Sequence, residues 1–193
     1  MQDYDERQLI YLASSGDTRA FETLMTQHEG RMYAVALRMC SNREDAQDCV
    51  QEAMIRAYRS MDSFKGQASF STWIYRVTMN ACLDELRRRK ARYASSLDNM
   101  IEGGWSPADD RETPEQQAVS SEKKRALEKA IKELPDDMRA AIVLRDVQGF
   151  SYDQIASILK ANVGTIKSRI SRGREKLRET IRQETELFEK YSV

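Results

Sequence analysis

Residues 151–177 read SYDQIASILKANVGTIKSRISRGREKL, and this stretch decides the fold of the C-terminal part of the chain. Ser151 and Gln154 have the spacing of a capping box, which predicts the start of a short helix. A turn over 160–162 precedes a second helix, whose apolar residues recur on one face: Val163, Ile166, Ile170, Gly173, Leu177 and Ile181. Two helices joined by so short a turn predict a helix-turn-helix.

The opposite face of the second helix is polar and cationic, carrying Thr165, Lys167, Ser168, Arg169, Ser171, Arg172 and Arg174. From Lys160 to Arg182 there are eight Lys and Arg residues against two Glu, a local charge of +6. Such a face suits the major groove of DNA. If about three to five of these cations contact phosphates, the log–log salt slope of binding is roughly −3 to −4.5. The alternative is an amphipathic helix with a solvated basic face.

The net charge of the whole chain does not reveal this local positive charge. Its 193 residues hold 31 Lys and Arg and 31 Asp and Glu, so the formal net charge is zero. The length predicts one or two small domains. Because no apolar run reaches the length of a membrane span and the first residues are acidic rather than apolar, we expect a cytoplasmic protein.

The cysteines and the histidine are too few and too scattered for a recognisable metal motif. Cys40, Cys49 and Cys82 include no CxxC pair, and His28 is the single histidine. The sequence therefore predicts neither a disulfide framework nor a zinc site, and no cofactor. We expect Cys49 to face the core and be inert, with redox sensing as the alternative. His28 lies on an apolar helix face and is expected to be structural.

With three prolines and eight glycines, the composition is helical and no strand pattern is present, so an all-α fold is predicted. The first domain covers residues 1–92, with a capping box at 41–44 opening one of its helices. Residues 93–113 are expected to form a flexible acidic linker. The second domain, residues 114–193, opens on a Thr-Pro-Glu-Gln cap at 113–116, with helices predicted over 114–133, 136–147, 152–160 and 163–187.

A polar stripe runs along the helix predicted over residues 44–61. Ala46, Cys49, Val50, Ala53, Ala57 and Met61 share the core side. The other side carries Asp48, Gln51, Glu52, Ile55 and Arg59. An isoleucine ringed by charges is typical of a protein-binding face. The alternative is that a neighbouring loop covers Ile55.

A second stripe lies on the helix that follows, where Arg76, Asn80, Leu83 and Arg87 are spaced by four, three and four residues. The preceding loop, residues 64–72, holds two aromatic residues, Phe64 and Phe70, near cations. Aromatic rings beside cations suit unstacked nucleic-acid bases. The alternative is that the two rings anchor the loop in the core.

These segments resemble a known family. Residues 48–58 (DCVQEAMIRAY), Phe64 and residues 70–76 (FSTWIYR) resemble the second conserved region of bacterial sigma factors. Leu134-Pro135, residues 149–156 (GFSYDQIA) and 163–169 (VGTIKSR) resemble the fourth. With a linker in place of the middle region, the layout is similar to the extracytoplasmic-function (ECF) group.

The resemblance implies roles for both stripes and for the second helix of the helix-turn-helix. It implies docking of Asp48, Gln51, Glu52 and Ile55, with Arg59 beside them, on the clamp helices of the polymerase β′ subunit. It implies contact with the minus-ten promoter element, including a flipped base. We assign this contact to Phe64, Lys65, Ser69, Ser71, Arg76, Asn80 and Arg87.

The minus-thirty-five element is then read by Thr165, Lys167, Ser168, Arg169, Ser171, Arg172 and Arg174. The resemblance also implies contact with the β flap, control by an anti-sigma factor, and a role in a stress or envelope response. Trp73 and Tyr75 stand without a third aromatic partner for promoter melting, which predicts limited melting.

Two other functions compete with an initiation factor. A self-contained helix-turn-helix regulator that dimerises on a palindrome leaves the stripe from Asp48 to Ile55 unexplained. An enzyme is disfavoured because the carboxylate pairs at 109–110 and 136–137 lie in the linker and at a helix start. Aspartates at a helix N-terminus stabilise the helix dipole. The sequence also holds no phosphate-binding glycine loop or nucleophile motif.

Overall fold

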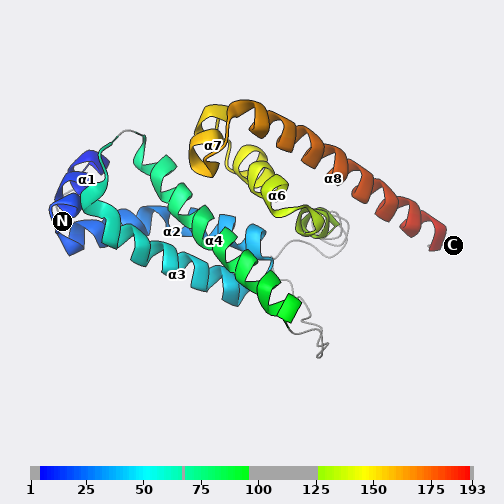
Figure 1. The fold of residues 1–193 in the computed structure, drawn as a ribbon, viewed down its shortest axis with the longest axis horizontal. Coiled ribbons are helices and arrows are strands. Elements are labelled where there is room, and N and C mark those ends of the chain that lie inside the picture. Colours follow the sequence, from blue (N-terminus) through cyan, green and yellow to red (C-terminus); the bar gives the residue numbers. More distant parts are fainter. Residues whose placement is uncertain (1–4, 67, 96–125, 192–193) are drawn as a thin grey trace, which may run out of the picture.

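The computed structural model describes residues 5–66, 68–95 and 126–191, and every regular element in these ranges is helical (Figure 1). The predicted all-α fold is therefore confirmed. The acidic linker from residue 96 onward and the predicted cap at 113–116 lie outside the described residues. None of the described helices has an apolar stretch long enough to cross a bilayer.

The N-terminal part is a bundle of α1 (Glu6–Ser14), α2 (Thr18–Cys40), α3 (Arg43–Ser60), the short η1 (Met61–Ser63) and α4 (Phe70–Ser95). Its core is formed by apolar residues at helical spacing, which α2, α3 and α4 turn toward one another. Fully buried examples are Leu24, Met32, Met39, Ala53, Ile74 and Met79. The last helix continues to Ser95, past the predicted end near Lys90.

Two residues connect α2 to α3, and they divide the capping between them. The prediction that Ser41 is the N-cap of α3 is wrong. Asn42 is the N-cap, and its Oδ1 accepts hydrogen bonds from the backbone N–H groups of Glu44 (2.8 Å) and Asp45 (3.4 Å). Ser41 instead ends α2 in the left-handed region, at φ 57°. Asparagine and serine are comparably good N-caps, so the sequence alone does not show which of the two residues caps α3.

The C-terminal part contains a helical segment over 126–133, then α6 (Asp136–Ile142), α7 (Tyr152–Leu159) and α8 (Val163–Tyr191). The capping box before α7 is confirmed, since Gln154 N–H donates to Ser151 Oγ (3.2 Å) and Ser151 N–H donates to Gln154 Oε1 (2.8 Å). The helix predicted over 136–147 ends in a π-helical turn, η2 (Val143–Val147). Gly149, at φ 75°, then reverses the chain.

The two parts pack against each other through α4, which runs alongside α6 and α7, and through α2, which contacts α6 and η2 (Figure 1). The Tyr75 ring meets the Phe150 ring edge to face, with centroids 4.9 Å apart. Its hydroxyl donates to Gln148 Oε1 at 3.0 Å. Arg139 Nη1 donates to the carbonyl of Met39 at 2.6 Å. These contacts join the two helical units into one apolar core.

Candidate functional site

The stripe on α3 forms one wall of a cleft of about 260 Å³. Four of the five predicted residues line it: Asp48, Gln51, Glu52 and Ile55. Arg59 is exposed one turn further along and is not among the lining residues. Ile55 is 39% exposed, so it is not buried beneath a neighbouring loop. The cleft thus offers an apolar side chain bordered by polar ones.

The other wall of the cleft comes from α4 and includes Ala81, Glu85 and Arg88. Sequence reasoning missed the two charged residues because they belong to a different helix from the stripe. Arg56 ties the walls together, donating to Glu52 Oε1 and to Asp84 Oδ2, both at 2.7 Å. These two carboxylates raise the pKa of Arg56. An ion pair between Arg56 and Asp84 thus links the two helices that form the cleft.

The residues predicted for the minus-ten element lie along the first half of α4 and the loop before it. Ser69 Oγ accepts the N–H of Thr72 at 3.1 Å, as an N-cap does. Lys65 is exposed, while Ser71, Arg76 and Asn80 are half-buried. Further along α4, the exposed Arg87 forms an ion pair with Asp84 at 3.2 Å.

Phe64, the remaining residue of that set, belongs to an aromatic cluster. Its ring lies 5.6 Å from Phe70 and 5.2 Å from Trp73, measured between centroids. The rings of the loop therefore anchor it in the core, as the alternative interpretation stated. Trp73 contacts both phenylalanines within this cluster, and the expectation of limited promoter melting stays a prediction. Tyr75 is 2% exposed and packs on Phe150 instead.

A second cleft, of about 310 Å³, lies where the two helical units meet. Ser71 and Tyr75 of α4 face Gln148, Phe150 and Gln154 across it, and Arg31 and Gly149 complete its lining. Part of the predicted minus-ten surface is thus adjacent to the C-terminal unit in this arrangement. No pattern within a single helix signals such a contact.

The helix-turn-helix is formed by α7 and the start of α8. Lys160 ends α7 in the left-handed region, at φ 49°. Asn162 caps α8, its Oδ1 accepting from Thr165 N–H (2.7 Å) and Thr165 Oγ1 (2.8 Å). Ile166 and Ile170 are buried in the core that includes Ile155 and Ile158 of α7. The geometry leaves the polar face of α8 directed outward.

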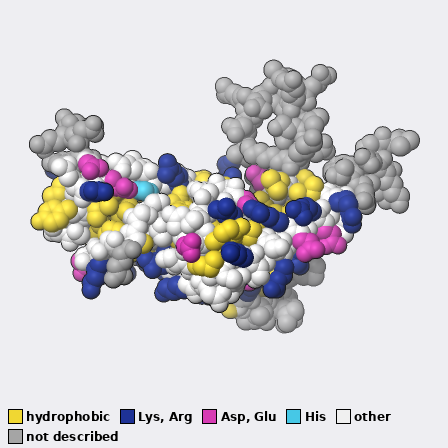
Figure 2. Space-filling model, turned by 90° about the horizontal axis from the view of Figure 1, so that it is seen from above, with side chains coloured by type: hydrophobic (Ala, Val, Ile, Leu, Met, Phe, Trp, Pro, Cys, Tyr) yellow, Lys and Arg dark blue, Asp and Glu magenta, His cyan; other side chains and the backbone are white. Residues whose placement is uncertain are grey.

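Exposure differs among the residues on that face. Lys167, Ser171, Arg172 and Arg174 are exposed, while Thr165, Ser168 and Arg169 are half-buried. Arg169 pairs with Asp137 at 3.0 Å, and Arg174 pairs with Asp146. Lys167 lies over the Tyr152 ring, 5.8 Å from its centroid. Figure 2 looks onto the molecule from the α7 and α8 side, and Lys and Arg side chains gather over the half that α8 occupies.

Two kinds of buried titratable group lie in the N-terminal unit. His28 is 6% exposed, with Nε2 3.4 Å from Glu6 Oε1, and burial lowers its pKa. The thiols of Cys40, Cys49 and Cys82 are all buried and converge. Hydrogen bonds from the other two thiols lower the pKa of Cys49. Sequence reasoning missed this cluster because its members come from three helices.

Comparison with known proteins places both regions. Residues 24–92 match sigma-70 region 2, and residues 124–177 match sigma-70 region 4. The RNA polymerase sigma-H factor of Pseudomonas aeruginosa is 34% identical over 174 residues, covering 88% of this chain and 90% of that protein. The ECF RNA polymerase sigma factor SigW of Bacillus subtilis is 37% identical over 179 residues, covering 90% and 95%.

Solved structures agree with these relatives. Sigma factor RpoE of Bartonella quintana, in complex with the anti-sigma factor NepR, superposes with a TM-score of 0.69 at 28% identity, covering 86% of this chain and 98% of that one. CnrH, in complex with the cytosolic domain of CnrY, shares the fold, with a TM-score of 0.64 at 24% identity over 93% of this chain and 99% of that one. The chain therefore belongs to the ECF sigma factors, which direct transcription by RNA polymerase and are not enzymes.

Proposed function

We propose that the cleft between α3 and α4 is the surface that docks on the β′ clamp helices of core RNA polymerase. The observation that carries this proposal is the exposed Ile55 in a cleft bordered by Asp48, Glu52 and Glu85. An apolar anchor within a polar rim is the usual anatomy of a protein-binding hot spot. The ion pair between Arg56 of α3 and Asp84 of α4 supports the proposal, since it connects the two helices that form the walls.

The test replaces Ile55 by serine and measures the Kd for core polymerase by fluorescence anisotropy of the labelled full-length chain. Loss of a central apolar anchor costs about 1–2 kcal/mol, so we expect Kd to rise roughly 5–30-fold. Tyr11→Ser is the control, because Tyr11 is 71% exposed on α1 and outside the cleft. Equal affinity of the Ile55 variant and the wild type contradicts the proposal.

We further propose that residues 1–92 recognise the minus-ten element, and that residues 114–193 recognise the minus-thirty-five element and contact the β flap. Residues 93–113 join them as a linker. The exposed cations on α8 support groove binding, Arg172 as a base contact and Arg174 as a phosphate contact. In holoenzyme footprinting, Arg172→Ala is expected to cost about 1–3 kcal/mol and to relax the sequence preference at one position. Arg174→Ala is expected to weaken binding uniformly and reduce the salt slope by about one.

A self-contained regulator remains the competing function, and a gel shift separates the two. We expect the free chain to bind a promoter duplex weakly, and core polymerase to confer specific binding. Tight sequence-specific binding by the free chain contradicts the polymerase-dependent mechanism.

We also propose that an anti-sigma factor restrains this chain, so that a stress signal releases it. The complex of the B. quintana relative with its anti-sigma factor supports this proposal. Co-purification from the native host with a tagged chain is the test. Recovery with polymerase subunits but with no stoichiometric inhibitor contradicts it.

A further inference from the structure

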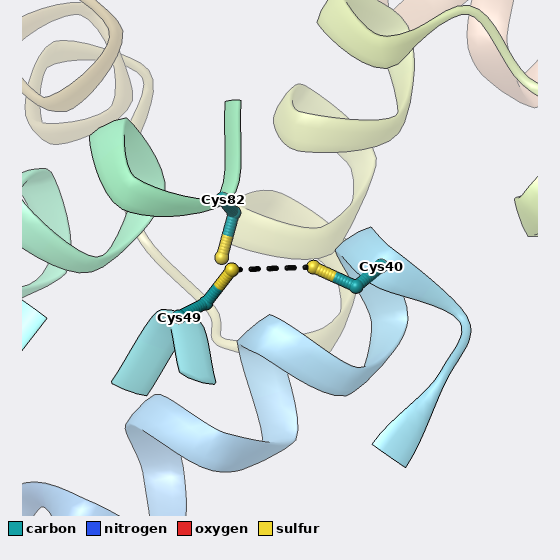
Figure 3. A group of neighbouring side chains, drawn as sticks. All are labelled: Cys40, Cys49 and Cys82. Atoms are coloured by element: carbon teal, nitrogen blue, oxygen red, sulfur yellow. Dashed lines mark hydrogen bonds between the residues drawn. The ribbon is translucent and has the colours of Figure 1, made fainter. Parts of the chain in front are cut away.

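Three thiols meet in the core of the N-terminal unit (Figure 3). Cys40 ends α2, Cys49 lies in α3 and Cys82 lies in α4. Their Sγ atoms all lie within 4.8 Å of one another, and those of Cys40 and Cys49 are 3.6 Å apart. The sequence contains no other cysteine, so every thiol of the protein is in this cluster.

The spacing of the sulfur atoms matches what a metal ion requires. A zinc–sulfur bond is about 2.3 Å long, so thiolates sharing one ion lie about 3.8 Å apart in tetrahedral geometry and about 4.0 Å apart in trigonal geometry. Displacements of about 1 Å or less bring the cluster to either arrangement. We propose that Cys40, Cys49 and Cys82 form a three-thiolate site for a soft divalent cation of the Zn²⁺ class.

A metal ion also needs a path into the core, and the cleft between α3 and α4 provides one. Cys49 is among the residues that line this cleft, although the side chain itself is 3% exposed. Since Cys49 lines the cleft and Cys40 and Cys82 do not, a cation entering there reaches the cluster at Cys49. The cleft also admits water as a fourth ligand, the coordination that zinc adopts where three protein ligands leave one position open.

The charged residues of the cleft are mixed: Asp48, Glu52 and Glu85 attract an entering cation, and Arg88 pairs with Glu85. Three thiolates and a divalent ion carry a net charge of −1, and the Arg88 guanidinium lines the same cleft. Ordinary packing explains one buried cysteine, since a thiol behaves as a small apolar side chain. Packing does not require three thiols from three helices to converge beside an open cleft. An ion at this position would cross-link α2, α3 and α4 beneath the surface that we propose binds polymerase. The proposed metal site does not depend on the proposed polymerase binding.

The experiment titrates the full-length chain with Cd²⁺ under a phosphine reductant and follows the thiolate-to-cadmium charge-transfer absorbance. Because the chain has three cysteines, the signal belongs to the cluster alone. We expect saturation at one equivalent, reversal by an excess of a chelator, and an increase in the thermal midpoint. Single replacements Cys40→Ser, Cys49→Ser and Cys82→Ser should each remove about a third of the absorbance and weaken the affinity at least tenfold.

Two control variants test whether Cd²⁺ binds outside the cysteine cluster. His28→Gln removes the one histidine, and Asp48→Asn removes a carboxylate from the cleft; both should keep one equivalent of bound cadmium with full charge-transfer intensity. Circular dichroism of each metal-free variant checks its fold, and alanine replaces serine wherever a serine variant unfolds. Absence of a charge-transfer band at stoichiometric Cd²⁺ overturns the proposal. So does metal-induced stabilisation that persists undiminished in the Cys82 variant.

Discussion

Arg139 is the residue whose replacement most sharply tests how the C-terminal unit holds together. It is 7% exposed, and its guanidinium donates to four carbonyl oxygens. Three belong to the end of the preceding helical segment, at Ile131 (3.1 Å), Lys132 and Leu134 (2.9 Å). The fourth is that of Met39, at the end of α2.

The expected magnitude follows from these contacts. A hydrogen bond to a charged group contributes about 1.5–3 kcal/mol, and burial of the guanidinium, which lowers the pKa of Arg139, offsets part of the total. Arg139→Ala removes a charged donor from four carbonyls, of which that of Ile131 keeps the N–H of Leu134 at 3.2 Å. We therefore expect a loss of about 3–5 kcal/mol, the range for removing one partner of a buried charged network.

Urea denaturation followed by circular dichroism measures this loss, and thermal unfolding checks it, with an expected fall of roughly 6–20 °C for a chain of this size. Arg139→Lys should lose most of the same free energy of unfolding, because an ammonium group cannot donate hydrogen bonds to all four carbonyl oxygens. Arg174→Ala is the matched control, since its ion pair with Asp146 is exposed and is expected to contribute about 1 kcal/mol or less. If the Arg139 and Arg174 alanine variants unfold at the same urea concentration, the argument from buried carbonyls is refuted.

Three further predictions concern the interior and one cap. The pKa of His28 lies below its ordinary value of 6.5 in the folded chain, so the unfolded chain binds the proton more readily. The free energy of unfolding should therefore fall as pH drops below 6.5 and level off below the folded pKa, and His28→Gln should flatten this part of the pH–stability curve. A Cβ atom at Gly173 would lie 2.9 Å from Ile142 Cγ1, so Gly173→Val should cost about 1–3 kcal/mol in urea unfolding. Gly30→Val, where a Cβ meets no atom within 4 Å, should cost less than 0.5 kcal/mol, roughly a surface substitution. Asn42→Ala should cost about 1 kcal/mol by thermal unfolding, whereas a larger loss on Ser41→Ala would mean that the cap is misassigned.

The features predicted well from the sequence are local ones. The helix-turn-helix follows from Ser151, Gln154 and the apolar spacing of α8, which involve neighbours within one or two turns. The stripe containing Asp48 and Ile55 follows from the periodicity of a single helix. Each of these patterns requires knowing only how one helix presents its own side chains.

The features that were missed depend on which helices meet. Glu85 and Arg88 share the cleft with Ile55 because α4 packs on α3. Tyr75 and Phe150 touch although 75 residues separate them, with residues 96–125 outside the described structure. Helical periodicity identifies a buried face without naming its neighbour, so neither contact can be read from spacing.

The two-residue connection between α2 and α3 has a consequence for altering this protein. Ser41 is occupied in closing one helix and Asn42 in opening the next, so no residue there is spare. The chain length at this point sets the rotation of α3 about its own axis, at about 100° per residue. Deleting either residue would turn the face that carries Ile55 away from α4, or force the helix to unwind a turn. Peptide tags, split sites and circular permutation therefore belong elsewhere in the chain, because this junction determines the direction of the α3 face that we propose docks on polymerase.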